Sequence, residues 1–192
     1  MQQTVLKNIT PEEYLAMEES AETRSEYYQG EIFNMAGGSS NHNLIVSNIQ
    51  SPMFLALRKQ KCFSYMLDML LRIKNIDLFT YPDIMVICGK PVFYEERKSV
   101  VTNPLLIIEV LSESTRNYDR GDKFEFYRQI PSFQEYVLVD QYKVHVEHFY
   151  LAEAGKWILS EYNDVSATLK LEKIDFAIPL QDIYYRVAFE TR

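Results

Sequence analysis

The stretch Pro104-Leu105-Leu106-Ile107-Ile108-Glu109-Val110-Leu111 (residues 104–111) places one carboxylate inside a continuous apolar run. A short run of Leu, Ile and Val that begins after a proline predicts a β-strand buried on both faces. An isolated buried carboxylate destabilises the fold by several kcal/mol unless it is paired, protonated or bound to a metal. Glu109 is therefore the first candidate for a functional residue.

A second acid stands in a similar apolar setting. Asp83 lies in YPDIMVIC (residues 81–88), and strand alternation places it on the same face as Met85. Two neighbouring carboxylates repel one another, and a divalent cation between them removes that repulsion. We predict that Asp83 and Glu109 hold a metal ion together. The alternative is structural, because carboxylates at strand ends also cap helices or pair with arginine.

The segment after Glu109 offers a positive charge. Residues 114–130 are predicted to form a helix, which ends before Pro131 and carries Asp119, Lys123 and Tyr127 four apart on one face. A lysine on this helix can reach back toward the acidic strand. The competing interpretation is a solvated helix face on which Asp119 and Lys123 pair with each other.

The rest of the chain predicts a mixed α/β protein. Thr10-Pro11-Glu12-Glu13 is typical of a helix start, and this helix is expected to run to about residue 19. Residues 24–35 predict two strands that turn at Gln29-Gly30. Further helices are predicted at residues 41–60 and 180–185, and further strands at residues 63–73, 81–88, 105–111, 135–140, 143–151 and 157–162. This order indicates an α+β or α/β fold with a mixed central sheet.

Composition bounds the classes of function. The 192 residues predict a single domain, and the net charge of −7 argues against a surface that attracts nucleic acid everywhere, although a local basic groove remains compatible. The N-terminal segment has no signal-peptide pattern and no stretch has the roughly 20 apolar residues of a membrane span. Cys62 and Cys88 fall in predicted strands and are expected to be reduced, buried thiols, so a cytoplasmic location is predicted.

Several motifs, in their order and spacing, carry a resemblance to a known family. They are YPD (81–83), Asn103-Pro104 leading into EVLSEST (109–115), YDRGDKF (118–124) followed by Tyr127, and EYVLV (135–139). The sequence resembles the Uma2 (DUF820) family, restriction-endonuclease-like proteins of the PD-(D/E)XK nuclease superfamily. The resemblance extends from residues 10–15 to residues 182–184, which covers nearly the whole chain.

The resemblance implies a restriction-endonuclease-like core: a mixed central β-sheet flanked by helices, with additional N-terminal and C-terminal strands, in one domain over residues 1–192. The signature acid of the superfamily corresponds to Asp83 and the glutamate of its E-x-K element to Glu109. The lysine of that element falls at Leu111, where this chain departs from the pattern, so the resemblance points to Lys123 on the next helix instead. Glu26, before a Gly-Glu turn, corresponds to an additional acid.

The function expected from residues and resemblance is a Mg²⁺- or Mn²⁺-dependent endonuclease that hydrolyses phosphodiester bonds, with DNA as the expected partner. Oxygen ligands suit these ions. The expected state is a homodimer without membrane contact. The expected catalytic residues are Asp83, Glu109, Lys123 and Glu26; the metal ligands Asp83, Glu109 and the carbonyl of Val110; and the phosphate contacts Arg24, Arg116 and Arg120.

One other interpretation of the function stays open at this point. The net charge of −7 and the leucine at position 111 favour a catalytically silent module that keeps the nuclease fold and binds nucleic acid or a protein partner. His42 and Asp68 match family positions too, but they are interpreted here as a polar residue at a helix start and a structural acid.

Overall fold

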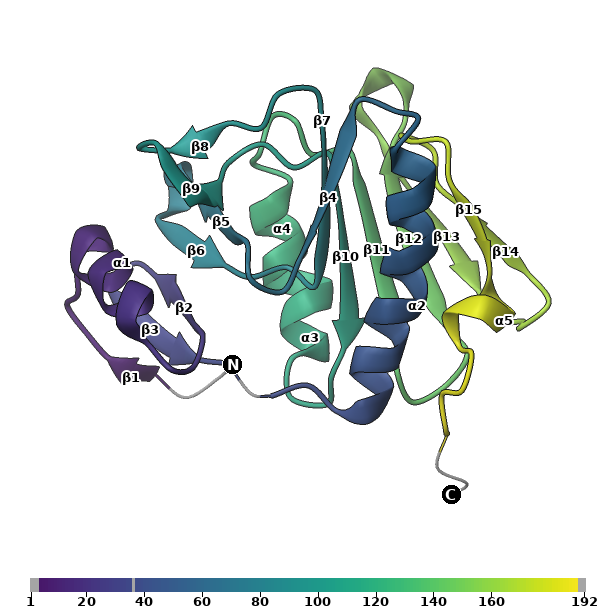
Figure 1. The fold of residues 1–192 in the computed structure, drawn as a ribbon, viewed down its shortest axis with the longest axis horizontal. Coiled ribbons are helices and arrows are strands. Elements are labelled where there is room, and N and C mark those ends of the chain that lie inside the picture. The colour runs from purple at the N-terminus through teal and green to yellow at the C-terminus, as the bar shows by residue number, and fades with distance from the viewer. Residues whose placement is uncertain (1–3, 36, 190–192) are drawn as a thin grey trace.

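A six-stranded mixed sheet forms the centre of the computed structural model, which describes residues 4–35 and 37–189 (Figure 1). The strand order is β13-β12-β11-β10-β7-β4. Strands β10 and β11 are parallel, and the other neighbouring pairs are antiparallel. The strands are β4 (Cys62–Met66), β7 (Ile84–Cys88), β10 (Leu106–Leu111), β11 (Glu135–Asp140), β12 (Val146–Leu151) and β13 (Trp157–Tyr162).

Strand β10 is the apolar run that contains Glu109, and all six of its residues are buried. Its alternation separates two hydrophobic cores. Ile108 and Val110 belong to the core on one face of the sheet, whereas Ile107 and Leu111 belong to the core on the other face. Glu109 therefore points to the second face, together with Ile107 and Leu111.

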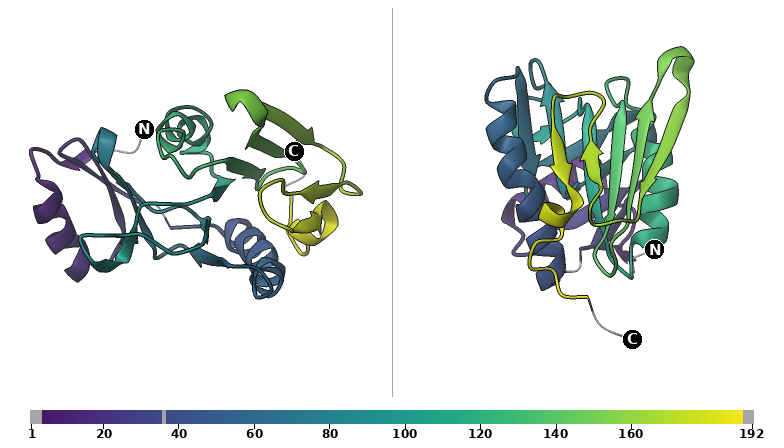
Figure 2. Two further views of the ribbon diagram at one scale, coloured as in Figure 1. Left: turned by 90° about the horizontal axis from the view of Figure 1, so that it is seen from above. Right: turned by 90° about the vertical axis from the view of Figure 1, so that its right-hand side faces the viewer.

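Helices cover both faces of this sheet (Figure 2). Helix α2 (Ser40–Leu57) lies on one face and buries Ile45, Ile49 and Met53 there. Helix α3 (Arg116–Tyr118), the π-helical turn η2 (Asp119–Lys123) and helix α4 (Phe124–Tyr127) follow one another on the other face. The mixed sheet flanked by helices confirms the expected fold class. The π-helical turn inside the expected helix was not predicted, and such turns are frequent at functional sites.

The additional N-terminal strands build a second sheet, with the order β1-β3-β2-β6-β5-β9-β8. Helix α1 (Pro11–Ser20) has the predicted capping box at Thr10 and Glu13, and it packs Tyr14 against Tyr27 and Phe79 of this sheet. The strands are β1 (Thr4–Leu6), β2 (Ser25–Tyr28), β3 (Glu31–Asn34), β5 (Leu70–Ile73), β6 (Leu78–Thr80), β8 (Phe93–Tyr94) and β9 (Arg97–Val101).

Smaller elements complete the chain. The short helical turns η1 (Lys74–Ile76) and η3 (Glu153–Gly155) lie in connections. The C-terminal hairpin of β14 (Thr168–Lys170) and β15 (Ala177–Pro179) and helix α5 (Leu180–Ile183) pack into the core beneath α2. None of the described helices has the length and apolarity needed to cross a membrane.

Two strand predictions require correction. Residues 63–73 were expected to form one strand, but the chain turns at Leu67, where φ is 52°, and β4 and β5 enter different sheets. Residues 81–88 were also expected to be one strand. Strand β7 begins at Ile84, so Asp83 lies immediately before it, in the connection from β6. Pro82 lacks an amide donor for strand pairing, which is consistent with this later start.

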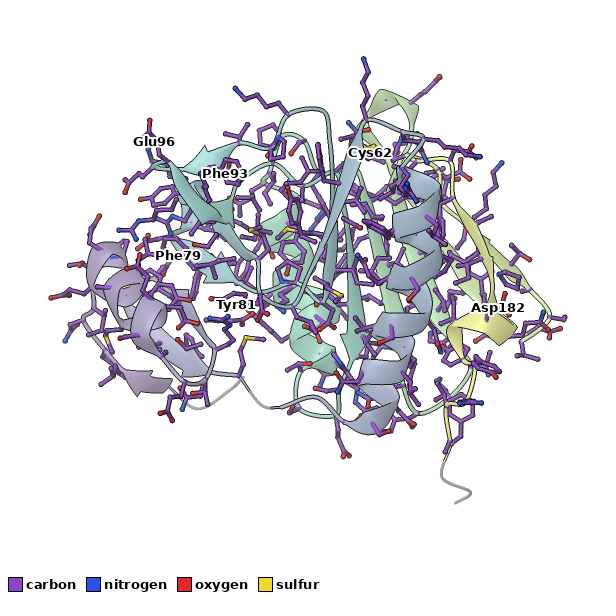
Figure 3. All side chains as sticks on the ribbon, viewed as in Figure 1. Cys62, Phe79, Tyr81, Phe93, Glu96 and Asp182 are labelled. Atoms are coloured by element: carbon purple, nitrogen blue, oxygen red, sulfur yellow. A yellow bond between two sulfur atoms is a disulfide. The ribbon has the colours of Figure 1, made fainter. Side chains whose placement is uncertain are left out.

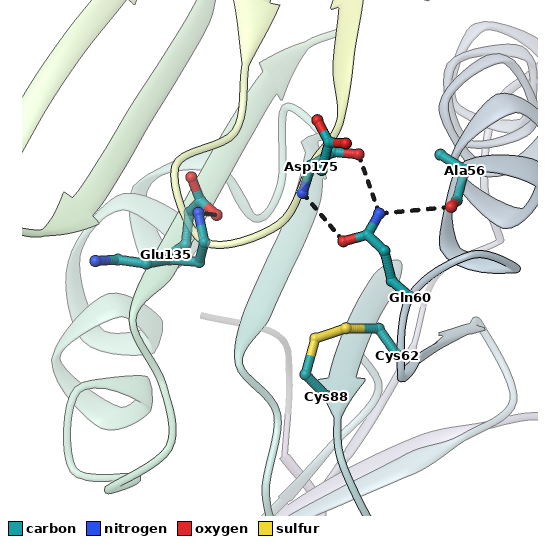
Figure 4. Close-up of a disulfide and its surroundings, with 7 residues drawn as sticks. Ala56, Gln60, Cys62, Cys88, Glu135 and Asp175 are labelled. Atoms are coloured by element: carbon teal, nitrogen blue, oxygen red, sulfur yellow. Dashed lines mark hydrogen bonds between the residues drawn. A yellow bond between two sulfur atoms is a disulfide. The ribbon is translucent and has the colours of Figure 1, made fainter.

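The expectation of two reduced thiols was wrong, because Cys62 and Cys88 form a disulfide (Figure 4). The two residues are directly opposite on the antiparallel strands β4 and β7, and their Cα atoms are 3.9 Å apart. The pairing of β4 with β7 was not readable from the sequence, so neither was this bond. Nearby, the Gln60 side chain donates to and accepts from the backbone of Asp175, at 3.0 and 3.1 Å.

Candidate functional site

Two hydrogen bonds hold the carboxylates of Asp83 and Glu109 at the junction of β7 and β10. The backbone amide of Asp83 donates to Oε2 of Glu109 at 3.2 Å. The backbone amide of Val110 donates to Oδ2 of Asp83 at 2.7 Å. Because Ile84 pairs with Ile108 in the register of these strands, the preceding Asp83 comes opposite Glu109. Backbone geometry therefore fixes two carboxylates side by side.

Lys123 reaches this pair from the π-helical turn η2. Its Nζ atom lies 3.2 Å from Oε1 of Glu109, 3.4 Å from Oε1 of Glu26 and 3.5 Å from Oδ1 of Asp119. The Tyr127 hydroxyl, one turn further along, donates to the same Oε1 of Glu109 at 2.7 Å. Lys123 thus bridges acids from three elements, and Tyr127 holds Glu109 from the same helical face.

Glu26 comes from β2 of the N-terminal sheet, so both sheets contribute to the cluster. Its Oε1 also accepts a hydrogen bond from the hydroxyl of Thr80, at the end of β6. Both side chains are buried. The second sheet is therefore part of the site and not an appendage to the core.

His42 was interpreted as a polar residue at a helix start, and the structure places it in the site. It lies in the first turn of α2, with Nε2 3.1 Å from Oδ2 of Asp83. Burial lowers the pKa of the imidazole, but the hydrogen bond to Asp83 and the charge of that carboxylate outweigh burial and raise the pKa overall. Asp68, by contrast, is exposed and pairs with Arg24 at 3.2 Å.

Acidic charge exceeds basic charge in this cluster. The carboxylates of Glu26, Glu109 and Asp119 contact the single ammonium group of Lys123, and a fourth carboxylate, that of Asp83, lies next to Glu109. Burial raises the pKa of Glu109 to about 8, and the neighbouring Asp83 and Asp119 add to this effect while Lys123 opposes it. Burial likewise raises the pKa of Asp119.

Lys123 stays cationic in this environment. Burial lowers the pKa of its ammonium group, but the charges of Glu109 and Glu26 more than compensate, and the pKa is raised well above its ordinary value. A lysine in this state does not act as a general base at neutral pH. It can hold carboxylates in place and stabilise negative charge on a bound group.

The cluster forms the floor of a cleft with a volume of about 540 Å³. The Gly37-Gly38 loop, residues 112–115 and Tyr81 supply its walls, and Figure 3 shows Tyr81 between the two sheets. In the described part of the chain, the lining includes Lys123 but no arginine. The cleft is open to ligands and rich in oxygen acceptors.

The donor set fits a divalent cation such as Mg²⁺. Among the residues that the structure describes, no three His, Cys, Asp or Glu side chains converge on one metal position. Mg²⁺ does not require such a cage, since it commonly binds one or two carboxylates and keeps several waters. Asp83 and Glu109 offer two adjacent carboxylates in a region with excess negative charge, which a dication would offset.

The three arginines expected to contact phosphate each face an acid. Arg24 pairs with Asp68 at 3.2 Å and Arg120 pairs with Glu147 at 2.7 Å. Arg116 lies 3.8 Å from Glu113, four residues after Ser112 of the cleft wall. Their predicted role in phosphate binding stays a prediction.

Known proteins match this chain over most of its length. The sequence profile of Uma2, described as "Putative restriction endonuclease", matches residues 11–181. Two proteins of Synechocystis sp. (strain ATCC 27184 / PCC 6803 / Kazusa) are similar. "Uncharacterized protein sll1609" is 40% identical over 164 residues, covering 85% of this chain and 93% of that protein. "Uncharacterized protein slr1290" is 35% identical over 183 residues, covering 94% of each.

A solved structure shares the fold. It is the crystal structure described as "a putative nuclease belonging to DUF820" from Anabaena variabilis ATCC 29413, and it superposes with a TM-score of 0.75 at 18% sequence identity. The match covers 92% of this chain and 97% of that chain. The mixed sheet, its flanking helices and the family match define a protein of the restriction-endonuclease-like nuclease class. Within that class, the chain belongs to the Uma2 family.

Proposed function

We propose that this protein is a divalent-metal-dependent endonuclease that hydrolyses phosphodiester bonds of DNA. The observation that carries the proposal is the contact set of Glu109. Its carboxylate is held next to Asp83 by the Asp83 amide, and it receives Lys123 at 3.2 Å and Tyr127 at 2.7 Å. A buried apolar strand does not need a carboxylate for its own stability, since burying one is costly even when it is paired.

Asp83 and Glu109 would hold Mg²⁺ or Mn²⁺ together with the carbonyl of Val110. When bound, the ion would acidify a water molecule and stabilise the charge that develops on the phosphate. The protein would contribute carboxylate ligands in fixed positions for the ion and a cationic Lys123 near the phosphate that is cleaved. Glu26 would help to position Lys123, since its Oε1 atom lies 3.4 Å from the ammonium nitrogen.

Cleavage of supercoiled plasmid and of single-stranded DNA with Mg²⁺ or Mn²⁺ tests this function. We expect wild-type protein to nick or linearise DNA and Asp83→Asn to lose at least about a hundredfold in rate. Asp182→Asn is the matched control, because Asp182 is an exposed acid on α5 at the far side of the molecule (Figure 3). Equal cleavage by Asp83→Asn and Asp182→Asn would contradict the proposal. Metal-independent binding without cleavage would support the silent module instead.

A further inference from the structure

A small apolar hollow lies next to the catalytic cleft. Its volume is about 80 Å³, and its lining includes Tyr28 and Phe33 from the N-terminal sheet and Tyr118 and Phe126 from the helices after β10. These four rings are neither fully buried nor fully exposed. The hollow therefore presents aromatic surface to solvent at the junction of the two sheets.

The hollow and the cleft are continuous. Glu26, Ser114, Thr115 and Tyr118 line both of them. Glu26 also contacts Lys123, which contacts Glu109. A ligand with one end in the hollow would therefore have its next groups at the proposed catalytic residues.

The rings of the hollow are arranged as an aromatic corner. The centroids of Tyr28 and Phe126 are 5.2 Å apart with an interplanar angle of 33°, and those of Tyr118 and Phe126 are 6.5 Å apart at 71°. Aromatic side chains stack on the faces of nucleobases, which is a common way to bind single strands without strong sequence preference. A planar ring suits a hollow of this shape and polarity.

Few basic groups line the described part of the cleft, so a stacking contact with a base would add affinity for nucleic acid. The described lining of the cleft includes Lys123 but no arginine, and Lys123 is already shared among three carboxylates. The chain carries a net charge of −7. Attraction of phosphates is therefore weak compared with that of a basic nucleic-acid-binding protein, and stacking can supply affinity that charge does not.

We propose that the hollow of Tyr28, Phe33, Tyr118 and Phe126 binds the base of an unpaired nucleotide beside the phosphodiester that is cut. The substrate class is then single-stranded or locally unpaired nucleic acid, because the faces of paired bases in a duplex are covered by their neighbours. This inference rests on the proposed nuclease function for the meaning of the neighbouring phosphodiester, but the binding of a base can be measured separately.

Binding by Phe126→Leu tests the hollow, because leucine keeps an apolar side chain and removes the ring. The control is Phe54→Leu, which changes an exposed phenylalanine on α2, outside the lining of the hollow. Affinity is measured by fluorescence anisotropy with Ca²⁺ in place of Mg²⁺. The probes are a labelled single strand, the blunt duplex of the same sequence, and a strand of the same length with abasic sites.

We expect the wild type to prefer the single strand over the duplex. Phe126→Leu should weaken binding of the single strand about tenfold, which is the effect expected from the loss of one base–aromatic stack. Its affinity for the abasic strand should equal that of the wild type. Phe54→Leu should bind all three probes as the wild type does. Thermal melting verifies that each variant folds, and Tyr28→Leu replaces Phe126→Leu if the latter does not.

Three results would contradict the proposal that the hollow binds a base. The first is equal single-strand binding by wild type and Phe126→Leu, the second an equal loss on the intact and abasic strands. The third is a difference in sedimentation between Phe126→Leu and the wild type without nucleic acid, which would make the hollow a contact between copies of the chain.

Cleavage assays with Mg²⁺ separate the two proposals. Ring-dependent binding without cleavage contradicts the nuclease alone, and cleavage with ring-independent binding contradicts the hollow alone.

Discussion

The ammonium nitrogen of Lys123 lies 3.2 Å from Oε1 of Glu109, and the two residues are 14 positions apart in the chain. The distance is short because the chain leaves β10 and returns along the same face of the sheet as α3, η2 and α4. Leu111, two residues after Glu109, packs in the core of that face. The side chain of a lysine at position 111 would lie on this same face of the sheet. Lys123 therefore brings its positive charge to the same region, but from the helical segment that covers the face.

Replacing Lys123 with methionine should strongly destabilise the fold. The variant leaves Glu26, Glu109 and Asp119 without their shared cation in a buried site. Breaking a buried ion network by removing one partner costs about 3–5 kcal/mol. Urea unfolding above the pKa of Glu109, about 8, where its carboxylate is ionised, measures this loss in the free energy of unfolding.

The control for that prediction is Lys98→Met, which removes an exposed lysine of β9 and should change stability little. Above the pKa of Glu109, about 8, the double variant Lys123→Met with Glu109→Gln should be more stable than Lys123→Met alone, because an unpaired carboxylate charge is then absent. A Lys123→Met protein as stable as the wild type would show that the network is not ionised as described.

Stabilisation by Mg²⁺ should grow as pH rises. Burial raises the pKa of Glu109 from its ordinary 4.5 to about 8. Between these values the unfolded chain releases its proton first, so without metal the contribution of Glu109 to stability falls as pH rises. The ion binds the carboxylate in its ionised form, so its affinity increases until Glu109 is deprotonated near pH 8.

Thermal melting with and without Mg²⁺, from about pH 6 to about pH 9, checks this dependence. The shift in melting temperature caused by the metal should be small at the acidic end and larger at the basic end. Glu109→Gln should show little metal-dependent shift at any pH. Glu125→Gln, an exposed substitution on α4, should behave as the wild type does. A shift that is independent of pH would argue against Glu109 as a ligand.

Sequence patterns predicted the two acids, because each stands in or beside an apolar run, although Asp83 precedes β7 and so was not placed by strand alternation. Helical spacing placed Asp119, Lys123 and Tyr127 on one face, but the resemblance to the family, and not the spacing, pointed to Lys123 as a site residue. Sequence patterns did not identify His42, which meets Asp83 across 41 positions in the chain. Local periodicity does not say which helix start lies over which strand end. A histidine just after the Gly-Gly-Ser-Ser break, in a chain with three histidines, was the available signal.

The second sheet was unpredicted for the same reason. Strands at residues 24–35 were recognised, but their pairing with β6 and the contact of Glu26 with Thr80 join segments 54 residues apart. The hairpin of β8 and β9 was missed because its sequence mixes charged and apolar residues without clear alternation, and because β8 is a two-residue strand at the edge of that sheet.

Replacing Tyr127 with phenylalanine should weaken catalysis without removing a metal ligand. Its hydroxyl donates to Oε1 of Glu109 at 2.7 Å. Loss of a partner that orients a ligating carboxylate lowers metal affinity or activity about 10–100-fold. Tyr136→Phe is the matched control. Its hydroxyl donates at 3.0 Å to the backbone oxygen of Asp119, so both variants lose one buried hydroxyl and about 1–3 kcal/mol of stability.

Cleavage rates and Mg²⁺ affinities of the two tyrosine variants, measured well below their melting temperatures, distinguish the roles. Only Tyr127→Phe should lower them. Equal losses in both variants would mean that the hydroxyl of Tyr127 contributes to folding alone and does not orient Glu109.

Reduction of the Cys62–Cys88 disulfide should destabilise the protein but leave the site intact. The bond closes a loop with a sequence separation of 26, and constraining a loop of that size in the unfolded chain contributes about 3 kcal/mol. It ties β4 to the end of β7, whereas Asp83 precedes the other end of β7.

We therefore expect a reductant to lower the urea midpoint of the wild type. It should not lower that of the Cys62→Ser/Cys88→Ser double variant. At temperatures where both are folded, they should cleave DNA at equal rates. Two thiols that react with an alkylating agent in unreduced, denatured wild-type protein would contradict the bond itself. A loss of cleavage in the folded double variant would instead mean that the disulfide positions Asp83 through β7.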